Sequence, residues 1–107
     1  SQARTYAQKA ISFNENYGEP YILLAQMYGS NPNWSDEPAL NRSTYYVVID
    51  KLQRAKAVDP SVTDKVNELI ATYARHTPQA KDLFMLGYKA GDRITIGGWI
   101  GESTTIR

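Results

Sequence analysis

Residues 21–28 read Tyr-Ile-Leu-Leu-Ala-Gln-Met-Tyr, and residues 66–73 read Val-Asn-Glu-Leu-Ile-Ala-Thr-Tyr. In both stretches the first, fourth, fifth and eighth positions carry apolar or aromatic side chains. Residues three, four and seven positions apart lie on one side of an α-helix. Each stretch therefore predicts a helix with a single apolar stripe, and the same stripe occurs twice in the chain.

The two stretches belong to a longer internal repeat. When the sequence is shifted by 45 positions, residues 3–28 align with residues 48–73 without a gap. The identical pairs are Gln8 and Gln53, Ala10 and Ala55, Leu24 and Leu69, and Tyr28 and Tyr73. Repetition at such a period is typical of architectures in which helical units stack on one another. Pro20 is expected to lie in the first turn of its helix, and Pro60 is expected to lie just beyond the end of the preceding helix.

The repeat resembles the tetratricopeptide motif, whose pattern is W-x2-L-G-x2-Y, then A-x3-F, then P. Residues 21–28 resemble its first helix, residues 48–60 its second helix, and residues 66–73 the first helix of the next repeat. The matching positions are Tyr21, Leu24, Ala25 and Tyr28, followed by Val48, Leu52, Ala55 and Pro60. Residues 3–15 resemble the last helix of a truncated repeat. The resemblance implies a mainly α fold, a right-handed α–α superhelix of helical hairpins.

An insertion lengthens the repeat. The period of 45 residues exceeds the usual period of roughly 34 by about 11, and the surplus lies at about residues 29–42. Turn-forming residues fill this segment, and Ser35 is a suitable N-cap. We expect a loop as far as Trp34 and then a helix from about residue 36 to 58. Residues 41–44 can break that helix into a short helix followed by the repeat helix.

The C-terminal part changes from helical to strand-like patterning. Thr77 and Pro78 predict an N-cap and a first-turn proline for one more helix, which ends near Gly87 or Gly91. Residues 93–96 alternate between polar and apolar side chains, residues 103–107 are rich in β-branched side chains, and turn glycines lie between them. Residues 92–107 therefore predict a β-hairpin packed on the last helices. We expect Trp99 and Ile100 to anchor it. The predicted organisation is a helical region, 1–91, and a hairpin, 92–107.

The segments 50–60 and 91–107 also resemble the C-terminal part of a family of bacterial tetratricopeptide proteins. This resemblance implies that Arg107 lies at or near the native C-terminus and that a longer parent carries further repeats upstream. The helical pattern is already present at residue 3, so we expect a fragment whose upstream part, including any export signal, is missing. The resemblance slightly favours the cell envelope or periplasm over the cytoplasm, and it implies no assigned activity.

Composition narrows the classes of function. Lysine and arginine total 12 against 11 acidic residues, a net charge of +1, which argues against a nucleic-acid-binding domain. The absence of cysteine excludes disulfides, thiolate metal sites and cysteine nucleophiles. No apolar stretch is long enough to span a membrane.

The remaining chemical signals are weak. His76 is the single histidine and is expected at the surface, and Asp36, Glu37 and Asp50 are expected to be solvated or capping carboxylates. The glycine-rich residues 97–101 lack the lysine and the following helix of a phosphate-binding loop. We predict no catalytic residues, no metal site and no cofactor.

A concave groove is the expected binding surface, because the first helix of each stacked repeat lines it. The predicted groove residues are Glu19, Ile22 and Gln26 from one helix and Asn67, Ala71 and Arg75 from the next. Asn67 and Arg75 are suited to binding backbone amides or a carboxylate of an extended peptide.

The expected function is non-enzymatic protein–protein interaction or scaffolding, with another protein or a peptide as the partner. One alternative is self-assembly into a homo-oligomer through the C-terminal strands. A second alternative is binding of a carbohydrate or small ligand around Trp34 in the inserted loop.

Overall fold

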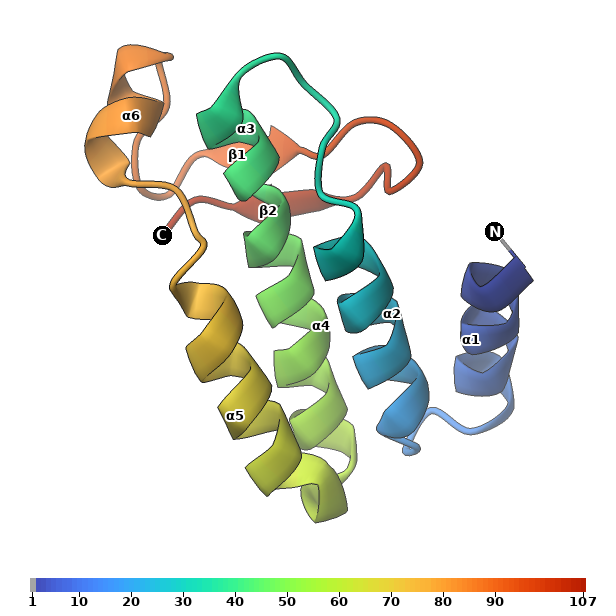
Figure 1. Cartoon of the computed structure of the whole chain (residues 1–107). Coiled ribbons are helices and arrows are strands. Elements are labelled where there is room, and N and C mark those ends of the chain that lie inside the picture. Colours follow the sequence, from blue (N-terminus) through green and yellow to red (C-terminus); the bar gives the residue numbers. More distant parts are fainter. Residues whose placement is uncertain (1) are drawn as a thin grey trace.

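The computed structural model describes residues 2–107, and it is mainly helical with a small two-stranded sheet at the C-terminal end (Figure 1). Ser1, at the start of the predicted helical region, lies outside the described residues. The elements in chain order are α1 (Gln2–Phe13), α2 (Glu19–Ser30), α3 (Pro38–Arg42), α4 (Thr44–Val58), the 3-10 helix η1 (Pro60–Val62), α5 (Thr63–Ala74), α6 (Ala80–Met85), β1 (Arg93–Thr95) and β2 (Ser103–Thr105).

The internal repeat of the sequence reappears in the helix boundaries. Adding 45 to the limits of α2 gives 64–75, and α5 covers 63–74. Adding 45 to the end of α1, residue 13, gives 58, which is the last residue of α4. Helix α2 packs on both α1 and α4, and α4 packs on α5, so the four long helices lie next to one another in chain order (Figure 1). The predicted helices of the repeat are therefore confirmed.

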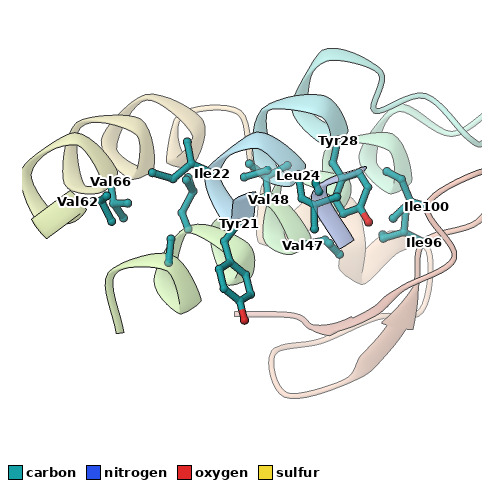
Figure 2. Packing of buried hydrophobic residues seen from close by; sticks show 14 residues of the cluster. Tyr21, Ile22, Leu24, Tyr28, Val47, Val48, Val62, Val66, Ile96 and Ile100 are labelled. Carbon is teal, nitrogen blue, oxygen red and sulfur yellow. The ribbon is translucent and has the colours of Figure 1, made fainter. Parts of the chain in front are cut away.

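The main core lies between α2 and α4. Tyr28, Val48 and Leu52 are fully enclosed, and Ala25 and Ala55 have no exposed surface either. Small side chains at these two positions let the helix axes approach closely. Figure 2 shows Leu24 and Tyr28 of α2 beside Val47 and Val48 of α4.

The insertion folds as the broken form of the predicted helix. Helix α3 ends at Arg42 and α4 begins at Thr44, with the buried Ser43 between them. The Thr44 hydroxyl donates to the Pro32 carbonyl at 2.9 Å, which fixes the start of α4 against the loop. Helix α3 begins at Pro38, two residues later than expected. Glu37, the residue before this proline, is extended with φ −92° and ψ 117°, because proline disfavours the helical conformation at the residue that precedes it.

In that loop the Asn41 amide oxygen accepts hydrogen bonds from the backbone N–H groups of Trp34, at 2.9 Å, and Ser35, at 2.8 Å. The Asn41 amide nitrogen donates to the Ser35 carbonyl at 2.9 Å. One side chain therefore satisfies three backbone groups, which is how a loop without regular structure can lie against the core.

The prediction for the start of α6 was wrong. The Thr77 hydroxyl donates to the Ala74 carbonyl at 2.9 Å, so Thr77 caps the end of α5 and does not begin the next helix. Helix α6 begins at Ala80, after Gln79 in an extended conformation, and ends at Met85. Gly87 then adopts a φ of 92°, a left-handed value that ends the helical segment. This is one of the two positions at which the sequence predicted the end of the helix.

The predicted C-terminal hairpin is confirmed as a two-stranded antiparallel sheet, with Ile94 of β1 opposite Thr104 of β2. Its four isoleucines, Ile94, Ile96, Ile100 and Ile106, are all at most 5% exposed. Figure 2 shows Ile96 and Ile100 close to Tyr28 of α2. Strand β2 packs on α4, and Leu83 of α6 joins Ile94 and Ile106 in a second, smaller cluster.

Ion pairs and hydrogen bonds fasten the hairpin to the helices. Glu102, between the strands, accepts a hydrogen bond from the Tyr28 hydroxyl at 2.6 Å and pairs with Lys51 at 2.7 Å. In β2, the Thr104 hydroxyl donates to Asp50 at 2.6 Å, and Arg107 forms an ion pair with the same carboxylate. These contacts hold a sheet that would be marginal in isolation.

Arg4 of helix α1 also binds the hairpin, close to Tyr28. The Arg4 guanidinium donates to the carbonyls of Trp99 and, at 3.0 Å, Ile100, and it lies 5.7 Å from the centre of the Tyr28 ring. The Trp99 ring meets Tyr28 edge-on, with centroids 5.2 Å apart. Trp99 and Ile100 thus act as the anchors that the sequence predicted, and they connect the hairpin to both α1 and α2.

The buried environment of the Tyr28 hydroxyl makes the free energy of unfolding depend on pH. Burial, and then the hydrogen bond to Glu102 and its negative charge, raise the pKa of Tyr28 from 10.0 to about 12. Above pH 10 an unfolded chain loses this proton while the folded chain keeps it, so the folded state binds more protons. The stabilisation is complete below pH 10 and is lost as the pH rises to about 12.

We therefore expect the free energy of unfolding, measured by urea denaturation across this pH range, to fall less steeply in Tyr28→Phe than in the wild type. Tyr6→Phe is the matched control, because Tyr6 is 71% exposed. Parallel pH profiles for wild type and Tyr28→Phe would contradict the assignment.

Candidate functional site

Asp50 and His76, two residues that the sequence analysis considered for their chemistry, both lie against other side chains. Within residues 2–107 no group of three or more His, Cys, Asp or Glu side chains is placed to hold a metal ion. Asp50 is engaged by Thr104 and Arg107, and His76 is exposed beside the Tyr45 ring, with centroids 5.3 Å apart. None of the helices described in residues 2–107 has the length and apolarity needed to cross a bilayer.

The six predicted groove residues separate into two groups. Glu19, Ile22 and Gln26 border a hollow between α1 and α2. On α5, Asn67 accepts a hydrogen bond from Lys56 of α4 at 3.0 Å, and Ala71 and Arg75 are exposed. The structure therefore brings the first three residues together with α1, while Asn67 is engaged by α4.

Two of these three residues are less exposed than the residues of an open groove would be. Ile22 is only 1% exposed, because α1 covers the side of α2 on which it lies. The sequence prediction placed Ile22 on a free surface, and it is instead part of the core. Glu19 is half-exposed and pairs with Lys65 of α5 at 3.3 Å, which leaves Gln26 as the exposed polar residue of the group without an ion pair.

The hollow between α1 and α2, which we call the α1–α2 cleft, has a volume of about 270 Å³. Ala7 and Ala10 of α1 form its small-residue wall, three positions apart on one helix face. Tyr6 and Tyr17 stand at its edge, 71% and 48% exposed. The cleft exists because alanines face α2 where larger side chains would fill the space.

Sequence reasoning missed the contribution of α1 to this cleft. The signal was available in part, since the aromatic Tyr6 precedes Ala7, and Ala7 and Ala10 are three positions apart in a predicted helix. What the pattern could not show is that α1 covers Ile22 and that Tyr17, in the loop after α1, turns back to the same place.

Trp34, the candidate for ligand binding in the inserted loop, has structural partners. Its indole N–H donates to the Leu40 carbonyl at 3.0 Å, and its ring lies against Gly97, where an added Cβ would be 2.9 Å from the ring. The ring packs on both hydrophobic clusters. Glycine at 97 is thus needed for close approach, and Trp34 connects the loop to the hairpin.

Tyr45 and Tyr73 form a second aromatic contact, with stacked rings and centroids 5.9 Å apart. The contact joins α4 to α5, and burial together with the neighbouring Tyr45 raises the pKa of Tyr73. Both tyrosines belong to the partly buried layer around the main core. Their placement accounts for two of the eight tyrosines as packing residues.

Large apolar side chains are also exposed on α6. Phe84 and Met85 are 74% and 83% exposed, whereas their neighbour Leu83 is 1% exposed and holds the helix on the second cluster. A hollow of about 460 Å³ lies beside Phe84 and Met85. The sequence prediction recognised the helix and did not identify this surface, because exposure of Phe84 depends on which side of α6 faces the sheet.

We expect Trp34→Ala to lower the free energy of unfolding by about 3 kcal/mol, the lower end for deletion of a core tryptophan, because the ring is partly exposed. A residue used only for ligand contact would change stability by no more than about 0.5 kcal/mol. Chemical denaturation followed by circular dichroism measures the difference, with Phe13→Ala as a control at an 88% exposed aromatic position. A wild-type denaturation curve for Trp34→Ala would show that the indole is available for another purpose.

Comparison of the chain with protein-family models, with curated proteins and with solved structures finds no match. The tetratricopeptide likeness therefore stays a prediction that rests on the residues of the internal repeat. The function has to be inferred from the surfaces of this chain.

Proposed function

We propose that this chain is a non-enzymatic protein–protein interaction or scaffolding module of the tetratricopeptide kind. In this proposal α1, α2, α4 and α5 are a segment of a right-handed superhelix, and the α1–α2 cleft receives an extended segment of a partner protein. The observation that carries the proposal is the pair of exposed tyrosines, Tyr6 and Tyr17, at the edge of a cleft walled by alanines.

Tyrosine is one of the residues most enriched among the energetic anchors of protein interfaces. Its ring offers a large apolar surface with little conformational entropy to lose, and its hydroxyl makes hydrogen bonds at the wet edge. Both features are present at the α1–α2 cleft, where Tyr6 and Tyr17 frame an apolar wall.

Polar residues at one side of the cleft provide specificity. The Gln26 amide can donate to and accept from a peptide backbone, and it is exposed in the same hollow. Glu19 contributes a carboxylate, already paired with Lys65, at the other end of the same stretch of α2. Such a mixture of apolar wall and few polar groups is typical of recognition sites.

We expect peptides selected from a random displayed library on the wild-type protein to bind Tyr6→Ala/Tyr17→Ala more weakly by roughly 2 kcal/mol or more, the range of interface anchor residues. Isothermal titration calorimetry with the selected synthetic peptides measures the loss. Gln26→Ala should weaken binding by about 1 kcal/mol, the net value of one hydrogen bond.

Phe13→Ala is the matched control for this experiment. Phe13 is on the same helix and 88% exposed, but it does not border the cleft. Equal affinities for the wild type and the double tyrosine variant, or an equal loss in Phe13→Ala, would contradict a binding role for the cleft.

Self-assembly through the C-terminal strands is the second candidate, and the pairing register favours it. Ile106 N–H donates to the Asp92 carbonyl and Ile96 N–H to the Glu102 carbonyl, so the pairs with mutual hydrogen bonds fall on the even positions of β1. The N–H groups of Arg93 and Thr95 consequently point away from β2. Within residues 2–107 neither has a hydrogen-bond partner, so β1 presents a short free edge.

Thr95→Pro tests this candidate without removing the buried isoleucines of the hairpin. Proline deletes only the outward N–H at position 95, so the internal pairing of β1 with β2 is kept. If strand addition assembles the protein, the mass measured by analytical ultracentrifugation falls to that of the monomer in Thr95→Pro. A wild-type mass equal to the 12.0 kDa of one chain would exclude this form of assembly.

A further inference from the structure

The hollow beside α6 is apolar on the inside. Leu83, Phe84, Met85, Tyr88 and Ile106 contribute to its lining, and its volume is about 460 Å³. Leu83 and Ile106 are buried, whereas Phe84 and Met85 are largely exposed and stand out from the helix. Exposed large apolar side chains that adjoin a hollow are typical of surfaces that contact another molecule.

Every charged residue that borders this hollow is basic. These residues are Lys81, Lys89 and Arg107. Lys89 pairs with Asp92 at 3.1 Å, and Arg107 pairs with Asp50, but neither carboxylate borders the hollow. Within residues 2–107 no ion pair involves Lys81, so at least one full positive charge is available at the rim.

Two further acidic residues lie on the other side of α6. Asp82 and Glu37 border a separate hollow of about 360 Å³, between α6 and the start of α3, which shares Met85 with the first. The charged residues that border the larger hollow are therefore basic, and those that border the smaller one are acidic. The positive rim of the larger hollow is a local feature, because the chain as a whole has a net charge of only +1.

From this arrangement we propose that the hollow beside α6 is a second binding site, which takes a peptide segment of a partner protein with a large apolar side chain flanked by carboxylates. The apolar anchor enters between Phe84 and Ile106, and the carboxylates meet Lys81 and Lys89 at the rim. Charge complementarity selects acidic over basic segments and raises the rate of association.

The shape of the surface favours a protein segment over a single lipid chain. A site for a small apolar ligand encloses most of the ligand surface. Here Phe84 and Met85 are 74% and 83% exposed, so they project toward solvent and can cover only part of any bound molecule. Projecting aromatic and methionine side chains suit contact with a broad partner surface, since methionine adapts its shape to different partners.

This site is independent of the α1–α2 cleft. Helices α6 and α1 lie at opposite sides of the molecule in Figure 1, and neither hollow shares a residue with the other. A partner at the α6 hollow can therefore bind whether or not the cleft is occupied. The two surfaces can be tested separately in one protein.

The test uses fluorescence anisotropy with two labelled synthetic peptides, one with a tryptophan flanked by aspartates and one in which lysines replace the aspartates. We expect the wild type to bind the aspartate peptide at least about tenfold more tightly than the lysine peptide, with the affinity falling as salt rises from about 0.01 M to about 1 M. Phe84→Ala and Lys81→Glu should each weaken binding at least about tenfold, the scale of an interface anchor.

Matched controls have the same chemistry elsewhere on the surface. Phe13→Ala and Lys9→Glu change an exposed aromatic and an exposed lysine of α1, far from α6. The Tyr6→Ala/Tyr17→Ala protein separates this site from the α1–α2 cleft. All three should bind the aspartate peptide like the wild type, and circular dichroism spectra should show that every variant keeps its helices.

Several results would overturn the proposal. These are absence of binding to the wild type, equal binding of the lysine peptide, and equal losses in Phe84→Ala and Phe13→Ala. Displacement of the peptide by laurate at concentrations below its micelle threshold would identify the hollow as a site for an anionic amphiphile. A dimer mass in ultracentrifugation that returns to the monomer in Phe84→Ala would show that the surface joins two copies of the chain.

Discussion

Helix α4 is enclosed by other elements along most of its length, with α2 and α5 packed beside it and β2 across its N-terminal half. Val48, Leu52 and Ala55 have no exposed surface. Burial of each valine or leucine side chain of this kind stabilises a fold by about 1.5–3 kcal/mol relative to exposure. Because α4 shares its surface with three neighbours, the positions of α2, α5 and the hairpin all depend on its side chains.

The polar contacts of the hairpin depend in turn on α4. Asp50 and Lys51, which are half-buried where α4 faces the hairpin, bind β2 and Glu102, and Glu102 connects onward to Tyr28 of α2. These groups are partly exposed, so each ion pair alone contributes little, at most about 1 kcal/mol. Their value lies in fixing the orientation of a short sheet whose isoleucines supply the larger, non-directional stabilisation.

The same arrangement decides which surfaces remain available. The hairpin covers the end of the α2–α4 pair, and Arg4 ties α1 to it, so the middle of the molecule is closed. The exposed large apolar side chains consequently gather at the two outer elements, α1 with its following loop and α6. Both binding proposals rest on this distribution, since exposed large apolar side chains that gather in one place are typical of surfaces that contact another molecule.

The helices of the repeat could be predicted because their apolar stripes have the helical period. The hairpin could be predicted because two stretches rich in β-branched residues flank a segment with turn glycines. Local chemistry also indicated the break between α3 and α4 and the anchoring by Trp99. The sequence alone did not show that α1 buries Ile22, that Trp34 packs on Gly97, or that Thr77 caps α5. Each of these depends on contacts between segments distant in the chain or on a choice between equivalent local hydrogen bonds. Periodicity determined which side of each helix is apolar, and only the tertiary structure decided which neighbour covers it and where Tyr6 and Phe84 stay exposed.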